Sequence, residues 1–346
     1  MSQKIYNTSL ILLLIYLITG IFLSLNAGIS HDEYHEQLNW EINLKAIKNF
    51  YQTGYYKDLL EYKDRYHGIG FNFLSQPFQY LIKDFLLSYL DINEYGSILI
   101  AKHPVIFILF FISSLFFYKI CIIFFNNKNF ALISLFIYLL YPYFLGHSFI
   151  NPKDIPFLSF WVISTYVLCK ILKKLYKEEP VPIKYIVYIS ISTSFLISIR
   201  IVGFLILLQF LIFIITFNEI KNKSFFNLIK NNIKNLFILL FTLVLFLYLL
   251  NPIFWHDPKE IVNSLKWMSK YQQDVSTLTL GEYMKSLNLP ASYYFIWLFF
   301  KLPILIILGF FIFPFLEKKF IKNNLNKILT YSLIFTCLII LFLFIL

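Results

Sequence analysis

Charged side chains are scarce in this sequence. Asp, Glu, Lys and Arg make up 14% of its 346 residues, whereas a soluble globular domain carries about 25%. Hydrophobic residues reach 59%, and 41 of the residues are Phe. Water therefore cannot be the main solvent of the chain. A membrane-spanning β-barrel is excluded as well, because the apolar residues form solid blocks rather than alternating segments of about ten residues.

Cysteine and the common nucleotide and metal motifs are also missing. The three cysteines lie inside apolar runs without a paired spacing, which excludes a disulfide framework and a cysteine zinc site. No P-loop, GxGxxG fingerprint or HExxH helix is present, so nucleotide-driven transport and zinc hydrolysis have no support. Asp and His are almost absent from the centres of the apolar runs, and this argues against a proton-relay transporter.

The apolar runs predict an all-α fold, a polytopic bundle of about nine transmembrane helices. Each run reaches or approaches the ~20 residues that cross a bilayer. The sequence shows no fixed repeat and no linker, so we expect a single domain over residues 1–346. The predicted spans are 6–29, 104–125, 129–147, 155–172, 184–199, 201–217, 235–252, 292–315 and 328–346.

Lysine distribution predicts the orientation. Lysines such as Lys128, Lys173 and Lys230 all fall on one side if nine spans alternate, and that side is cytoplasmic together with the N-terminus. The net charge of +11 then reflects topology, and we expect no nucleic-acid partner. The outer loops are 30–103, 148–154 and 253–291. They, or the outer ends of spans, hold all six histidines and 15 of the 19 carboxylates, all but Glu178, Glu179, Glu219 and Glu317.

The first outer loop begins with an acidic cluster. Ser30 can cap a helix over about 31–53, and Asp32 and Glu33 favour its first turn through the helix dipole. One interpretation is a cap with a solvated face. The other is functional: a carboxylate at the exit of a membrane helix can act as general base on a lipid-linked substrate, with His31 and His35 in the same substrate or acceptor loop.

The second outer loop carries one carboxylate. Asp154 stands between Pro152 and Pro156, which restrict the backbone, and Lys153 is beside it. Asp154 either caps the fourth helix or joins Asp32 in a metal or acceptor site.

A single arginine interrupts the central apolar stretch. Arg200 emerges at the outer interface if the stretch forms two spans, where its guanidinium suits a phosphate group. The alternative is an arginine that only extends its side chain to the interface.

The third outer loop combines aromatic and ionisable residues. A predicted amphipathic helix over 258–272 follows His256 and Asp257, and the loop closes near Glu282 and Tyr283. An interfacial aromatic belt explains the tyrosine, but it does not explain the histidine and carboxylates.

Taken in order, four motifs resemble the family 39 membrane glycosyltransferases of the GT-C fold, the dolichyl-phosphate-mannose protein mannosyltransferase type. The motifs are Asp32-Glu33, residues 151–156 (Asn-Pro-Lys-Asp-Ile-Pro), residues 200–203 (Arg-Ile-Val-Gly), and the segment from Asn251-Pro252 through residues 281–283 to Leu289-Pro290. The resemblance implies inverting transfer of a hexose or pentose from a polyprenyl-phosphate carrier to a protein, lipid or glycan acceptor at the outer face.

Residue roles follow from the same resemblance. Asp32 is implied as the catalytic base with Glu33 as its neighbour, Asp154 as the second acidic residue, and Arg200 or Lys153 as partners of the carrier phosphate. Which carboxylate is the base stays open, and so does metal dependence. If a divalent metal ion binds, its expected ligands are His31, Asp32, His35 and Asp154.

The sequence departs from the family in two respects. Its acidic motif reads His31-Asp32-Glu33, and this is why the choice of base stays open. The chain ends inside an apolar run, so we expect acceptor-binding parts to be missing or the chain to be shortened. A transporter or flippase of a lipid-linked or anionic solute is the alternative function, and a non-catalytic membrane scaffold is the third. The composition suggests an AT-rich bacterial genome and hence a multi-pass protein of the inner membrane with its active face in the periplasm.

Overall fold

The computed structural model is nearly all-α and describes residues 3–89, 92–270, 275–290, 292–321 and 323–345. Its residues fall into two compact units, which we describe separately. Unit 1 comprises residues 1–206 and 229–261, and unit 2 comprises 207–228 and 262–346. The prediction of a single domain stays a prediction.

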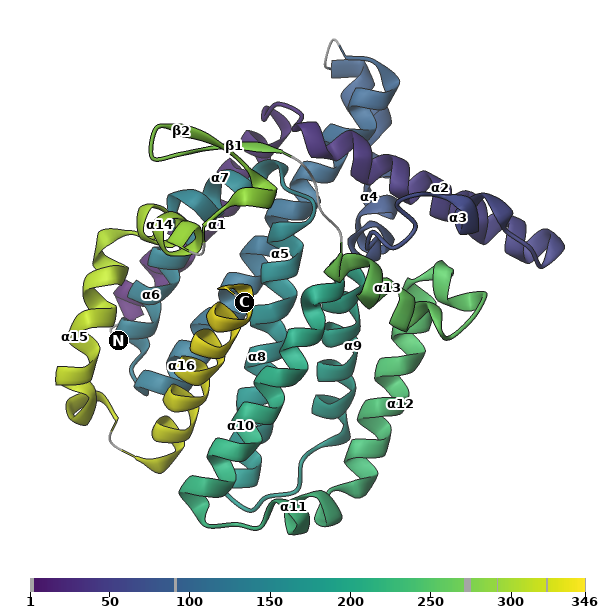
Figure 1. The fold of residues 1–346 in the computed structure, drawn as a ribbon. Coiled ribbons are helices and arrows are strands. Elements are labelled where there is room, and N and C mark those ends of the chain that lie inside the picture. The colour runs from purple at the N-terminus through teal and green to yellow at the C-terminus, as the bar shows by residue number, and fades with distance from the viewer. Residues whose placement is uncertain (1–2, 90–91, 271–274, 291, 322, 346) are drawn as a thin grey trace. The chain divides into compact units, whose positions relative to one another are not determined.

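Unit 1 is a helical bundle with α5 at its centre (Figure 1). Helix α5 packs against α1, α4, α6, α7 and α8, while α9 packs against α4, α8 and α12. The approach of α1 to α5 is close enough that a Cβ on Gly20 would lie 1.9 Å from Phe107 Cζ. The elements of this unit are α1 (Gln3–Leu25), α2 (His31–Thr53), α3 (Lys57–Glu61), α4 (Gly70–Tyr89), α5 (Glu94–Phe125), α6 (Lys128–Leu140), α7 (Pro142–Ile150), α8 (Asp154–Tyr176), α9 (Ile183–Ile199), η1 (Ile201–Phe204), α12 (Ile233–Leu250) and η2 (Pro252–Trp255).

Unit 2 contains most of the remaining helices and a small sheet. Its elements, two of which begin in unit 1 and one of which ends there, are α10 (Leu205–Lys221), α11 (Phe225–Asn231), α13 (Glu260–Ser269), β1 (Ser276–Thr279), β2 (Glu282–Lys285), η3 (Ser286–Asn288), α14 (Ser292–Lys301), α15 (Ile304–Phe320) and α16 (Asn324–Ile345). The strands pair antiparallel with Thr279 opposite Glu282. Leu280 and Gly281 join them, both with positive φ, as a type I′ hairpin turn requires. This hairpin was not predicted.

The membrane character of the chain is confirmed, whereas the count of nine spans is not. Within the described residues, six helices are long and apolar enough to cross a bilayer, and two bent pairs raise the number to as many as eight. The pairs are α6 with α7, bent by 56°, and α14 with α15, bent by 109°. The remaining predicted span, 184–199, corresponds to α9, whose 17 residues are fewer than the ~20 that cross a bilayer. The last residue of the final predicted span, 346, lies outside the described residues.

Helix α5 begins ten residues before the predicted span 104–125, and its polar start has a physical explanation. Its 32 residues correspond to about 48 Å of helix, more than the ~30 Å of a hydrocarbon core. Lys102 and His103 mark the predicted boundary, yet both are buried in protein, where side chains from other segments bind them. Because other protein groups bind these two side chains, the helix can begin ten residues before the predicted boundary.

Helix α2 follows the predicted interval 31–53 and runs across unit 1 rather than along it (Figure 1). Ser30 occupies the N-cap position, and the Glu33 carboxylate accepts the Ser30 N–H at 2.6 Å, one half of a capping box. Gly54 ends the helix in the left-handed conformation, with φ of 73°. Local capping signals therefore set both ends of this helix.

Candidate functional site

Two ion pairs bring together segments of unit 1 that are far apart in sequence. Lys153 Nζ lies 2.6 Å from Glu36 Oε1, and Arg200 Nη2 lies 2.5 Å from Asp154 Oδ1. Lys153 and Asp154 are adjacent, so the first half of α2, the turn before α8 and the end of α9 meet at one place. We call the ionisable side chains of this region the polar cluster: His35, Glu36, Asp64, His67, Lys153, Asp154 and Arg200.

The turn before α8 is built around Asn151. Its Oδ1 accepts the backbone N–H of Lys153 at 3.0 Å and that of Asp154 at 2.7 Å, while its Nδ2 donates to Asp154 Oδ2 at 3.0 Å. Asp154 is the first residue of α8, with Lys153 at the N-cap position. The alternative that Asp154 itself caps this helix is therefore wrong. Asn151 accepts two N–H groups at this end of the helix, and the Asp154 carboxylate binds Arg200 instead of capping it.

Arg200 separates two helices, as one of the sequence alternatives required. Helix α9 ends at Ile199, Arg200 is extended, and η1 then leads into α10. Gly203 permits the close approach of η1 to the last turn of α9, because a Cβ there would lie 2.8 Å from the Leu196 carbonyl oxygen. The side chains of Arg200 and Asp154 are 40% and 49% exposed, so the pair faces the surface of unit 1.

Lys153 has two partners within the protein. Besides Glu36, its ammonium group contacts His67 Nδ1 at 3.3 Å. Both members of the Lys153–Glu36 pair are largely shielded from solvent. No partner of Glu36 was predicted, because no local pattern links it to a residue 117 positions away. Binding of Lys153 or Arg200 to a carrier phosphate stays a prediction, and each would have to share or exchange a carboxylate partner.

The adjacent carboxylates Asp32 and Glu33 differ in surroundings. Asp32 is exposed and forms no hydrogen bond or ion pair within the described residues. Glu33 is 2% exposed, and beyond its bond to Ser30 its Oε2 lies 2.8 Å from His103 Nε2. The other ring nitrogen of His103 contacts the Ser24 carbonyl oxygen at 3.0 Å. Glu33 is therefore held on both oxygens, while Asp32 is open to solvent.

A second buried contact lies one turn further along the same side of α2. The Lys102 ammonium, fully enclosed by protein, donates to Asn72 Oδ1 at 2.8 Å and to Gln37 Oε1 at 3.2 Å. We call these side chains, with Glu33 and His103, the buried network. It ties α2 to α4 and α5.

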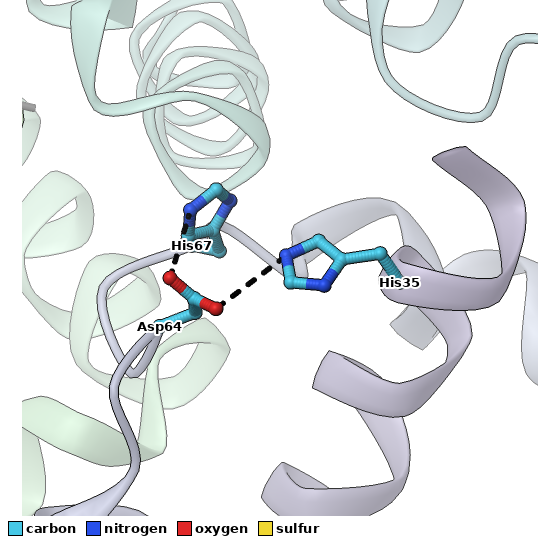
Figure 2. A group of neighbouring side chains, drawn as sticks. All are labelled: His35, Asp64 and His67. Atoms are coloured by element: carbon cyan, nitrogen blue, oxygen red, sulfur yellow. Dashed lines mark ion pairs between the residues drawn. The ribbon is translucent and has the colours of Figure 1, made fainter. Parts of the chain in front are cut away.

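Three neighbouring side chains of the polar cluster face one another (Figure 2). His35 Nε2 lies 3.8 Å from Asp64 Oδ2, and His67 Nε2 lies 3.7 Å from Asp64 Oδ1. One ligand atom from each residue lies within 4.8 Å of the other two, a grouping that could hold a metal ion. Burial, together with the charge of Lys153, lowers the pKa of His67 to about 4, so its imidazole is neutral at neutral pH.

Sequence reasoning did not single out Asp64 or His67. A signal was present: an Asp-x-x-His spacing directly before Gly68, in a loop that also holds His35. Of the ligands expected from sequence if a metal binds, only His35 belongs to this group. His31 is exposed at the start of α2, and Asp154 binds Arg200.

The predicted residues of the third loop are divided between the two units. In unit 1, His256 is exposed and Asp257 accepts the backbone N–H of Lys259 at 2.8 Å, which makes it a turn residue. In unit 2, Glu282 and Tyr283 are exposed on strand β2. A role for any of these four in substrate or acceptor binding stays a prediction.

The third loop also supplies a contact that was not predicted. The Tyr66 hydroxyl donates to Glu260 Oε2 at 2.5 Å, which links the turn that carries Asp64 and His67 to the start of α13.

Comparison with known proteins assigns no family to this chain, so its function is argued from its own residues. Compared with protein-family models, curated proteins and solved structures, the chain matches none of them.

Proposed function

We propose that this membrane protein is an inverting glycosyltransferase that moves a hexose or pentose from a polyprenyl-phosphate carrier to a hydroxyl group of an acceptor. One observation carries the proposal. Residues from three of the motifs that resemble family 39 glycosyltransferases lie in one region: α2 continues directly from Asp32, and Lys153, Asp154 and Arg200 join it through two ion pairs. Scattered helix caps would not require this convergence.

Asp32 is the better choice as general base. A base must reach the acceptor proton, and Asp32 is exposed at the first turn of α2, a few residues after the apolar helix α1. Glu33 is buried and holds Ser30 and His103 with its two oxygens, so it lacks both access and a free oxygen. We therefore assign Glu33 to positioning α2, and Asp32 to proton removal.

Arg200 and Lys153, the cations of the polar cluster, are suited to bind the phosphate of the carrier. Arg200 and Asp154 are nearly half exposed, and an exposed ion pair is worth only about 0–1 kcal/mol. A phosphate can therefore replace Asp154 at small cost and accept two hydrogen bonds from the guanidinium. Lys153, one residue from Asp154, adds positive charge at the same place.

The proposed reaction is a single displacement. The acceptor oxygen forms a bond to the anomeric carbon, the bond from that carbon to the phosphate oxygen breaks, and Asp32 takes the hydroxyl proton. Attack from the face opposite the leaving group inverts the anomeric centre. Negative charge develops on the departing polyprenyl phosphate, where Arg200 and Lys153 stabilise it.

The test is sugar transfer in membranes that contain the chain. Radiolabelled polyprenyl-phosphate hexoses and pentoses are supplied, and label that leaves the carrier for any other lipid, glycan or protein fraction is counted. Loss of a general base reduces a rate by roughly 10²- to 10⁴-fold, and we expect this for Asp32→Asn. Asp58→Asn is the matched control, because Asp58 is an exposed carboxylate that pairs with Lys45 outside the polar cluster.

The outcomes separate the alternatives. Full activity of Asp32→Asn at equal protein level would remove Asp32 from the mechanism. Loss of transfer in Glu33→Gln but not in Asp32→Asn would reverse the assignment of the base. Absence of transfer from every labelled carrier in the unaltered chain, with movement of the carrier across sealed vesicles instead, would favour a flippase.

A further inference from the structure

A group of one carboxylate and two imidazoles lies beside the ion pairs of the polar cluster. We propose that His35, Asp64 and His67 form a binding site for a divalent transition-metal ion, with Zn²⁺ as its occupant. The proposal does not rest on glycosyl transfer, and nothing in the proposed reaction uses the ion.

The spacing of the ligand atoms suits a shared ion better than direct contact. The distances from Asp64 to the two histidines, 3.8 Å and 3.7 Å, are too long for hydrogen bonds. Zinc binds imidazole nitrogen and carboxylate oxygen at about 2.0–2.2 Å, so two of its ligand atoms can be at most about 4.2 Å apart. Both distances are within this limit. All three ligand atoms lie within 4.8 Å of one another. The ligand atoms of a tetrahedral ion with bonds of this length are about 3.4 Å apart, so closure around an ion shortens these separations by at most about 1.4 Å.

The turn that presents Asp64 and His67 is fixed from several sides. The His67 N–H donates to the Asp64 carbonyl oxygen at 2.9 Å, which places the two side chains on one turn. Tyr62 donates to Asn39 Oδ1 at 2.6 Å and so anchors the turn to α2, the helix that carries His35. Such support limits the freedom of the ligands before an ion arrives, and this is a property of built metal sites.

Backbone packing fixes the other side of the turn. Gly68 follows His67, and a Cβ at Gly68 would lie 2.4 Å from the carbonyl oxygens of Ser198 and Ile199. The turn therefore rests directly on the end of α9. Any larger residue would displace it.

Ligand type and exposure indicate the metal and its coordination. Imidazole ligands favour zinc and other first-row transition metals over Mg²⁺ and Ca²⁺, which prefer oxygen. Three protein ligands leave one position of a tetrahedral zinc ion open. The His35 side chain is 41% exposed and that of His67 11%, so the ion enters from the His35 side, where its open position also lies.

The position of Lys153 beside His67 predicts an effect on metal binding that an ion bound elsewhere on the protein would not show. A metal bound at His67 Nε2 leaves the ring proton on Nδ1, which then faces the Lys153 ammonium 3.3 Å away. Two donors cannot hydrogen-bond each other, so Lys153 must turn from His67 and keep Glu36 alone. Removal of this cation should therefore strengthen metal binding.

The experiment is metal binding by the full chain, purified in detergent with its affinity tag removed and stripped with a chelator. Zn²⁺ is titrated by calorimetry, and Co²⁺ is added in parallel, because its visible spectrum reports nitrogen and oxygen coordination. We expect one Zn²⁺ per chain. Loss of a supporting partner alone costs about 10- to 100-fold in metal affinity, so His35→Ala and His67→Ala should each weaken binding by at least about tenfold.

Variants make the result decisive. His256→Ala removes an exposed histidine outside the group and should leave zinc binding unchanged, while Lys153→Met should tighten it. Correct folding of each variant is checked by its elution as a single species. Equal binding by the unaltered chain, His35→Ala and His67→Ala would overturn the site, as would no binding by the unaltered chain at millimolar zinc. Neither result depends on sugar transfer, so this proposal and the proposed function can fail separately.

Discussion

The first half of α2 presents two sides with opposite properties. On one side, Glu33 and Gln37, one turn apart, are buried against α5, where His103 and Lys102 bind them. On the adjoining side, Asp32 is exposed, and Glu36, although largely buried, pairs with Lys153 from a distant loop. The same helix therefore contributes to the buried network and to the polar cluster, whose exposed members are His35, Asp154 and Arg200.

This difference separates stability from chemistry. A charged group enclosed by protein loses its hydration, so its partners cannot be exchanged cheaply. A charged group at the surface keeps water as an alternative partner, and its ion pairs are weak. We therefore expect substitutions in the buried network to reduce folding stability, and substitutions of the exposed members of the polar cluster to reduce function.

The largest effect should come from His103→Ala. Removing one partner of a buried pair leaves Glu33 Oε2 enclosed without a partner, which costs about 3–5 kcal/mol. The measurement is thermal unfolding of the purified chain in detergent, with protein yield as a second readout. Glu33→Gln should cost much less, because its amide can still accept from Ser30 and donate to His103. Equal stability of His103→Ala and the unaltered chain would mean that the buried network does not hold α2.

A smaller effect is expected at the support of the polar cluster. In Gly68→Ala the new Cβ would meet the backbone of Ser198 and Ile199 at 2.4 Å, and such overpacking costs typically about 1–3 kcal/mol. The displaced turn should also bind zinc more weakly. Gly28→Ala is the matched control, because no atom outside its immediate chain neighbours lies within 4 Å of a Cβ there. Comparable unfolding temperatures and zinc affinities for the two variants would contradict the close packing of the turn.

Features with local causes could be predicted from the sequence. The limits of α2 were predicted correctly because Ser30 and Gly54 cap the helix within a few residues of its ends. The break at Arg200 was also foreseen as an alternative, since a charge and a nearby glycine interrupt an apolar stretch. The hairpin was missed although Leu280-Gly281 forms its turn, because only a glycine at the second position hinted at positive φ.

Features that depend on distant partners could not be predicted. Helix α5 was expected to begin after His103, since nothing near it in sequence indicates that Glu33, 70 positions earlier, would bind the ring. The pairing of Asp154 with Arg200 has the same character, and it replaced the local cap that sequence reasoning considered. Asp64 and His67 gained significance only when the fold placed His35 beside them.

The smallest effect on stability should come from Asp154→Asn. The Asp154 carboxylate and the Arg200 guanidinium are exposed enough that their ion pair contributes at most about 1 kcal/mol. Asn at this position keeps a group that can accept from Asn151, so α8 should still begin at the same residue. Unfolding of Asp154→Asn beside His103→Ala, under the same conditions, tests this directly.

A large loss of stability in Asp154→Asn would show that the pair is structural, and it would contradict the proposed exchange of Asp154 for phosphate. Near-normal stability would leave Arg200 with a partner that an anionic ligand can displace. The Glu33–His103 contact and the Asp154–Arg200 pair would then differ in energetic role, because the first is enclosed on every side whereas the second keeps water as an alternative partner.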